Sequence, residues 1–232
     1  MSWAASRPLP TWPRPLTRGA RVALVAPAGP LDAERIARSE ERCRALGLDP
    51  VVYPSAAART RYFAGSDAAR LKDLQAAFDD PATDAVWALR GGYGTMRIVD
   101  DLDLGRQLRD PIPFIGFSDN TTLHVRHAAI GVVSFHGPHP GGDFPPKTEE
   151  AFRSALFAPG SSGPLPIQAG DPLPRTLVPG TVSAPLFGGN LSVLAALCGA
   201  KDPLDARGHI LFLEDVGEPA YRVDRMLTQL GR

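Results

Sequence analysis

The sequence predicts an α/β fold: a mainly parallel sheet with helices on both faces, followed by a smaller, incomplete C-terminal domain. The first supporting observation is that short apolar runs, typical of buried strands, alternate over residues 18–135 with longer amphipathic segments of helical periodicity. The second is that polar or glycine-rich clusters follow the apolar runs directly, as connecting loops do. After residue 185 only one strand pattern and two helical patterns follow, which is a thin core for a separate domain.

Five strands and four helices are predicted before residue 136. The strands correspond to apolar runs at residues 21–26, 50–53, 84–89, 113–117 and 132–135. The helices have apolar residues at helical spacing and begin after Asp32, after Ser66 or Asp67, at about Thr95, and after Asp119. We expect them to end at Gly47, Phe78, Leu102 and Ile130, in that order.

The pattern changes after His136. Helices are predicted over residues 147–157, 190–199 and 221–230, and a buried strand over residues 210–213. Residues 158–185 are rich in Pro, Gly and Ser and predict loop and irregular strand. The predicted division is a Pro-rich N-terminal arm at 1–17, an α/β domain at 18–157, a linker at 158–185 and the start of a C-terminal domain at 186–232.

Composition excludes several classes of protein. The 232 residues include 25 Lys and Arg and 25 Asp and Glu, and this neutral balance argues against a nucleic-acid or anionic-membrane partner, because both require a basic surface. No apolar run approaches the ~20 residues of a membrane-spanning helix, and prolines and arginines interrupt the first 19 residues, unlike a signal peptide. The two cysteines, Cys43 and Cys198, are too few for a disulfide framework or a zinc cage. We therefore expect a cytoplasmic protein with no metal.

Four polar clusters follow predicted strands, at residues 26–30, 90–94, 116–120 and 214–218. Ligands of parallel α/β sheets bind at this edge. In the third cluster, Ser118 stands between an apolar strand and a helix, where its hydroxyl can project above the sheet and helix amides can stabilise an oxyanion. Asn120 replaces the second glycine of the G-x-S-x-G pattern. The alternative interpretation is that Ser118 or Asp119 caps the helix.

The other clusters also leave alternatives open. Glycines at 90–94 permit close approach of a substrate to bare amides, but a plain strand-to-helix turn explains them equally, and no phosphate-binding fingerprint is present. Glu214 or Asp215 could orient a catalytic histidine, or belong to a solvated loop or helix cap. His136 and His139 imitate metal ligands, although a hydrogen bond of His136 within its loop is the favoured interpretation.

Taken together, these motifs resemble the LD-carboxypeptidase family of serine peptidases, which also contains the microcin C immunity peptidases. The most specific motifs are RGGYG at 90–94, GFSD at 116–119 and LEDVGEPAYRVDRML at 213–227. The resemblance also covers most of the chain after the N-terminal arm, at residues 22–30, 62–81, 85–103, 113–124, 132–138, 187–200 and 209–230.

The resemblance implies that Ser118 is the nucleophile, that Glu214 is the acidic triad member, and that the amides of Gly92 and Asp119 form the oxyanion hole. The implied reaction is hydrolysis of the amide before a terminal D-amino acid of a muropeptide, as in cell-wall recycling, by a homodimer without a cofactor. Residues 18–157 would then be the nucleophile domain. Arg90 and Arg222 are candidates for binding the terminal carboxylate, because an arginine can hold a carboxylate through two hydrogen bonds, or they form structural ion pairs.

The chain departs from the family pattern at one position. The triad histidine of the family lies downstream of the acidic residue, and the sequence ends at Arg232 before such a segment. The histidines present do not match that motif: they are His124, His127, His136, His139 and His209. We therefore expect either a fragment of an active enzyme or an inactive truncated form. The alternatives are a non-catalytic peptide-binding homologue and an immunity-type peptidase acting on a peptide–nucleotide antibiotic.

Overall fold

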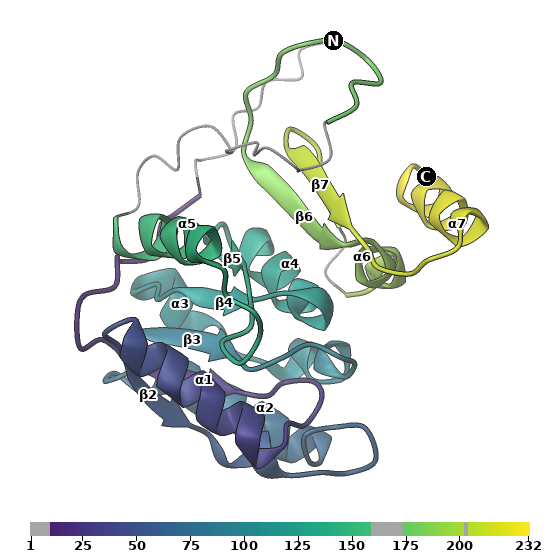
Figure 1. Ribbon diagram of the computed structural model, residues 1–232. Coiled ribbons are helices and arrows are strands. Elements are labelled where there is room, and N and C mark those ends of the chain that lie inside the picture. The colour runs from purple at the N-terminus through teal and green to yellow at the C-terminus, as the bar shows by residue number, and fades with distance from the viewer. Residues whose placement is uncertain (1–9, 159–173, 202–203) are drawn as a thin grey trace.

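The computed structural model describes residues 10–158, 174–201 and 204–232. Its main feature is a five-stranded sheet with the order β2-β1-β3-β4-β5, in which every neighbouring pair is parallel (Figure 1). The strands are β1 (Arg21–Val25), β2 (Asp49–Val52), β3 (Ala85–Ala88), β4 (Phe114–Gly116) and β5 (Phe135–His136). The predicted fold class is confirmed.

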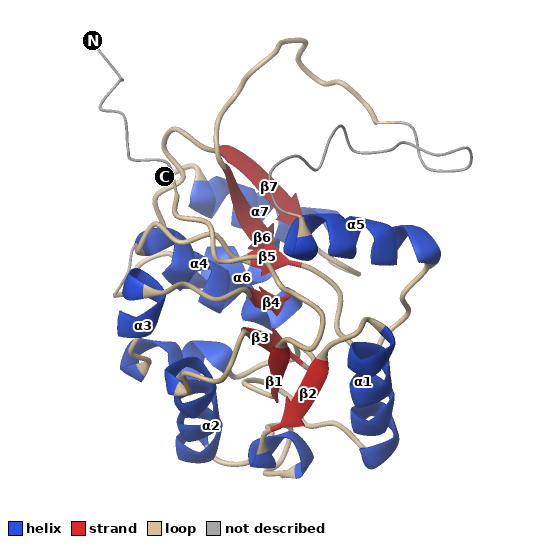
Figure 2. Cartoon of the chain, turned by 90° about the vertical axis from the view of Figure 1, so that its left-hand side faces the viewer, coloured by secondary structure: helices blue, strands red, loops and turns tan. Residues whose placement is uncertain are grey.

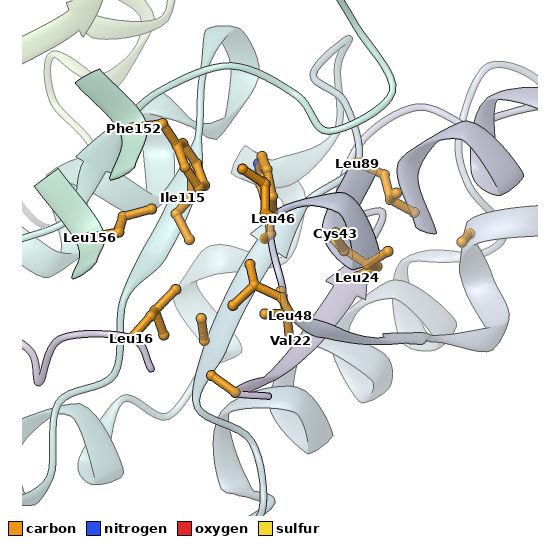
Figure 3. Packing of buried hydrophobic residues seen from close by; sticks show 14 of the residues in the cluster. Leu16, Val22, Leu24, Cys43, Leu46, Leu48, Leu89, Ile115, Phe152 and Leu156 are labelled. Carbon is orange, nitrogen blue, oxygen red and sulfur yellow. The ribbon is translucent and has the colours of Figure 1, made fainter. Parts of the chain in front are cut away.

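Helices cover both faces of this sheet (Figure 2). One face carries α1 (Ala33–Ala45) and α5 (Pro146–Phe157), and the other carries α2 (Asp67–Asp79), α3 (Gly105–Arg109) and α4 (Thr121–Ala129). Because successive strand residues point to opposite faces, β1 contributes Val22 and Leu24 to the cluster under α1 and α5, and Ala23 and Val25 to the cluster on the other face. Figure 3 shows the first cluster, in which Cys43 of α1 and Phe152 of α5 pack over the sheet.

Local signals in the sequence determine where α1 and α2 begin. The Asp32 carboxylate accepts a hydrogen bond from the Arg35 amide at 2.8 Å and caps α1. The Ser66 hydroxyl accepts one from the Ala69 amide at 3.2 Å, so Ser66 rather than Asp67 caps α2.

A second, two-stranded parallel sheet lies above α4 (Figure 1). It consists of β6 (Leu186–Asn190) and β7 (Ile210–Glu214), followed respectively by α6 (Leu191–Leu197) and α7 (Ala220–Leu230). The Asn190 amide donates to the Thr121 hydroxyl at 2.9 Å, and a Cβ on Gly189 would lie 2.6 Å from that oxygen. β6 therefore meets the start of α4 at van der Waals distance.

Two sequence-based predictions were wrong in detail, and two elements were not predicted. Residues 95–102 form two 3₁₀ turns, Thr95–Arg97 and Val99–Asp101, because tertiary hydrogen bonds hold Thr95 to Asp119 and Arg97 to Asp67. β5 starts at Phe135 instead of Val132, which forms an isolated bridge to Thr11. α3 and β6 were not predicted, since α3 has five residues and β6 contains two glycines.

Residues 1–9 of the predicted arm and 159–173 of the predicted linker lie outside the described residues. The domain boundaries therefore stay a prediction.

Candidate active site

Ser118 lies on a sharp corner between β4 and α4. Phe117 is extended, with φ of −150° and ψ of 178°, whereas Ser118 has φ of +62° and begins the 3₁₀ turn Ser118–Asn120 that leads into α4. Positive φ is disfavoured for a residue with a Cβ, and such strain occurs preferentially at functional sites. A serine on a strained strand-to-helix turn has its hydroxyl exposed above the sheet, which is the geometry of a nucleophile elbow.

Two glycines make this corner sterically possible. A Cβ on Gly116 would lie 2.9 Å from the Asn120 Cβ, and a Cβ on Gly91 would lie 2.8 Å from the Ser118 Cβ and 3.0 Å from its Oγ. Real Cβ atoms do not approach so closely, so both positions require glycine. Gly91 therefore brings the loop at residues 90–94 directly against the Ser118 side chain.

Asp119 and Asn120 fasten that loop to the corner. The buried Asp119 carboxylate accepts a hydrogen bond from the Thr95 amide at 2.9 Å, and the Asn120 Nδ2 donates to the main-chain oxygens of Arg90, at 3.2 Å, and Phe117, at 3.0 Å. Burial raises the pKa of Asp119 above its ordinary value. No side-chain hydrogen bond caps the 3₁₀ turn or α4, so the capping interpretation of Ser118 and Asp119 was wrong.

The buried Arg70 side chain anchors the loop at residues 90–94. The fully buried Arg70 guanidinium donates to the main-chain oxygens of Pro27 and of Gly94, the latter at 2.9 Å, and it also pairs with Asp67. Gly92 is exposed and has φ of +121°. Within the described residues, its amide donates no main-chain hydrogen bond.

The structure gives the two candidate arginines different partners. Arg90 donates to the main-chain oxygens of Pro30, at 3.1 Å, and Gly91, at 3.2 Å, and burial lowers its pKa. Arg222 forms an ion pair with Glu218 at 2.9 Å. Arg90 thus links two loops near Ser118, whereas Arg222 belongs to the first turns of α7.

Glu214 and Asp215 have separate surroundings. The Asp215 carboxylate accepts a hydrogen bond from the Ser192 amide at 3.0 Å, at the start of α6. Glu214 instead faces β5, where its Oε1 lies 3.7 Å from Nε2 of His136. Burial raises the pKa of Glu214, against the opposing effect of a hydrogen bond with Asn190, and burial lowers the pKa of His136. The predicted local hydrogen bond of His136 is present as a bond to its own main chain. The contact with Glu214 across the two sheets was not predicted.

His124 and His127, both on α4, have structural roles. His124 donates from Nε2 to the Gly116 oxygen and accepts at Nδ1 from the Ser134 hydroxyl, both at 2.8 Å. His127 donates from Nδ1 to the Leu123 oxygen at 2.7 Å. Burial lowers the pKa of His124 to about 3 and that of His127 to about 4, so both rings are neutral near pH 7. All five histidines are described, and none forms a hydrogen bond to Ser118 Oγ.

A shallow cavity of about 530 Å³ opens beside Phe117, the residue before Ser118. Its walls are Phe117, His136, Gly137, Pro138, His139, Gly142 and Asp143. The described residues contain no group of three or more His, Cys, Asp or Glu side chains placed to hold a metal ion. No helix in the described ranges is both long and apolar enough to cross a membrane.

Comparison with known proteins assigns the family. Residues 22–137 match the LD-carboxypeptidase N-terminal domain, and residues 183–232 match the LD-carboxypeptidase C-terminal domain. The chain belongs to the LD-carboxypeptidase family, peptidase family S66. It is 40% identical over 224 residues to the murein tetrapeptide carboxypeptidase of Pseudomonas aeruginosa, covering 90% of this chain and 71% of that protein.

Solved structures agree with this LD-carboxypeptidase assignment. The muramoyltetrapeptide carboxypeptidase of Oxalobacter formigenes is 30% identical, with a TM-score of 0.75 over 91% of this chain and 71% of that one. An MccF-like protein of Bacillus anthracis has a TM-score of 0.80 over 95% of this chain and 75% of that one, and at 22% identity it supports the fold alone. The resemblance seen in the sequence is confirmed, and the chain is of the carboxypeptidase class of hydrolases.

Proposed function

We propose that this LD-carboxypeptidase chain carries the nucleophile and the acidic triad residue of a serine peptidase that removes the terminal D-amino acid from murein peptides. The observation that carries the proposal is the φ of +62° at Ser118, on a corner where Gly91 has no side chain to collide with the hydroxyl. The names of the relatives, which are murein and muramoyl tetrapeptide carboxypeptidases, support this substrate class.

In the proposed mechanism, Ser118 Oγ attacks the carbonyl carbon before the terminal D-residue while an imidazole base removes its proton. The amides of Asp119 and Gly92 stabilise the oxyanion of the tetrahedral intermediate, and loss of one such donor typically costs ~10²–10³ in kcat. The C–N bond then breaks and the D-amino acid leaves with the proton. Water hydrolyses the Ser118 ester, and Glu214 stabilises the imidazolium in both steps. No cofactor enters this scheme.

The product of the reaction tests this proposal. We expect mass spectrometry to show free D-alanine when the complete gene product is incubated with a murein tetrapeptide, and no D-alanine with the Ser118→Ala variant. No release by the unaltered protein, or equal release by both, would refute the peptidase assignment. Parallel assays with a peptidyl-nucleotide would distinguish a murein peptidase from an immunity-type peptidase.

A second candidate function is peptide binding without turnover. The observation favouring it is that none of the five histidines of the chain forms a hydrogen bond to Ser118 Oγ. Calorimetry would then show a muropeptide binding to the 232-residue chain with no product formed. Slow turnover that disappears in Ser118→Ala would exclude this candidate.

Two expectations accompany the proposed peptidase. They are a cytoplasmic location, which comes from the cysteine content and the N-terminal sequence, and a homodimer, which comes from the family resemblance. Cell fractionation tests the first and sedimentation velocity tests the second.

A further inference from the structure

Two buried polar atoms face each other between the five-stranded and the two-stranded sheet. Nε2 of His136 lies 3.7 Å from Oε1 of Glu214, and both atoms are buried without a hydrogen-bond partner among the described residues. Buried polar atoms in native proteins nearly always have a partner, because the loss of their bonds to water must be compensated. Their separation is slightly longer than a hydrogen bond, and the Glu214 carboxylate also has a hydrogen bond with the Asn190 side chain.

The fold fixes the His136 side of this contact. Gly116 of β4 lies in register with His136 of β5, and the Gly137 amide donates to the Gly116 oxygen at 3.0 Å. The imidazole packs edge-on against the Phe212 ring, with centroids 5.0 Å apart, and lies 5.5 Å from the His124 ring. These contacts restrict rotation of the imidazole and keep Nε2 directed at β7.

The Glu214 side is fixed by the second sheet. Glu214 lies in register with Asn190 of β6, and Oδ1 of Asn190 accepts from the Val193 amide at 3.2 Å at the start of α6. Asn190 is also tied to α4 through the Thr121 hydroxyl. The two side chains therefore meet because each belongs to a strand that is anchored next to the Ser118 corner.

Few titratable groups lie near His136 and Glu214. Glu214 is faced by His136 from β5 and by Asp215 from its own segment, and His136 is faced by His124 from α4 and His139 from the following loop. Burial keeps His136 neutral near pH 7, so it supplies a single N–H without a positive charge. A neutral donor can hold a carboxylate in place without neutralising its negative charge. The carboxylate can then still stabilise a positive charge on a third group.

We propose that His136 is a positioning residue for Glu214. Nε2–H of His136 donates to Oε1 of Glu214 and, together with the hydrogen bond from the Asn190 side chain, fixes the carboxylate so that it faces the imidazole that activates Ser118. The role rests on the proposed peptidase function. Outer hydrogen-bond partners of this kind orient catalytic groups, and their loss typically lowers activity by ~10–100-fold where they support metal ligands.

A matched pair of variants tests the contact. A glutamine places its amide Nε2 at the same number of bonds from Cβ as imidazole Nε2, whereas asparagine places its amide nearer to Nδ1. We expect His136→Asn to raise the pKa of Glu214 by about one unit, because a hydrogen bond to the charged form is lost, and His136→Gln to recover most of this change. Titration of ¹³C-labelled glutamate carboxyl groups by NMR, assigned with Glu214→Gln, measures these pKa values.

His139→Asn is the control, because His139 lines the same cavity but is not among the groups that shift the pKa of Glu214. It should leave the pKa of Glu214 unchanged. Equal pKa values in wild type, His136→Asn and His136→Gln, or equal shifts in the two variants, would overturn the proposal.

Kinetics of the complete gene product provide the second measurement. We expect His136→Asn to lower kcat for D-alanine release about tenfold with little change in KM, and His136→Gln to recover most of the loss. A change confined to KM would contradict a positioning role. If wild type and Ser118→Ala both release no D-alanine, the proposed function fails, and the NMR titration still decides whether His136 holds Glu214.

Discussion

The Asp119 carboxylate accepts a hydrogen bond from the Thr95 amide at 2.9 Å, which ties the loop at residues 90–94 to the corner that carries Ser118. The two segments belong to adjacent parallel strands, β3 and β4, and both reach the same edge of the sheet. The strain at Ser118 is therefore maintained by its neighbours on both sides: Asp119 holds Thr95, and Gly91 packs against Oγ.

Asp119→Ala should lower the free energy of unfolding by about 2 kcal/mol, because the buried Thr95 amide loses a charged acceptor. Asp119→Asn keeps an acceptor oxygen and should lose less. Urea unfolding at pH 7 measures both values. Equal stability of wild type and Asp119→Ala would show that this bond does not hold the loop.

Gly91→Ala should abolish most D-alanine release, because the new Cβ would lie 2.8 Å from the Ser118 Cβ and displace the hydroxyl. A displacement of about 1 Å in an active site can cost ~100-fold in rate. Gly180→Ala is the matched control, since a Cβ there meets no atom within 4 Å. If the two variants have equal rates, Gly91 is not packed against the nucleophile.

Arg70→Lys should lower the free energy of unfolding by about 3 kcal/mol, because the buried oxygens of Pro27 and Gly94 lose a guanidinium that reaches both. Arg97→Lys is the comparison, because Arg97 binds the same Asp67 from an exposed position and should change stability very little. Thermal and urea unfolding of both variants measure the difference. Similar losses in the two would contradict the anchoring role of Arg70.

Stability should fall as the pH is lowered below 6.5. The pKa of His124 is lowered to about 3 by burial, so between pH 6.5 and 3 the unfolded chain binds a proton that the folded chain does not. Each such histidine contributes a slope of about 1.4 kcal/mol per pH unit, with stability rising toward neutral pH. His124→Gln should reduce the slope measured between pH 4 and 6 by about that amount. An unchanged slope would show that His124 takes up its proton without unfolding.

Local chemistry explains why most of the fold could be predicted from the sequence. Apolar runs fixed the central strands, and the side chains of Asp32 and Ser66 are the caps that such residues form before a helix. Residues 95–102 had helical periodicity, but the bonds from Thr95 to Asp119 and from Arg97 to Asp67 join distant segments and were invisible in the sequence.

The candidate site could be predicted from the sequence only in part. The position of Ser118 at a strand-to-helix junction follows from the sequence, whereas its positive φ depends on the packing of Gly91 and Gly116. The contact between His136 and Glu214 joins strands of two different sheets. It depends on how β6 docks on α4, which no local pattern specifies.

The rate of D-alanine release from a murein tetrapeptide by the complete gene product, compared with its Ser118→Ala variant, tests the central claim most directly. We predict that the variant folds normally and loses more than ~10³-fold in kcat, as serine peptidases do without their nucleophile. A variant that retains its rate within tenfold of wild type would show that the hydroxyl on this corner does not attack the substrate.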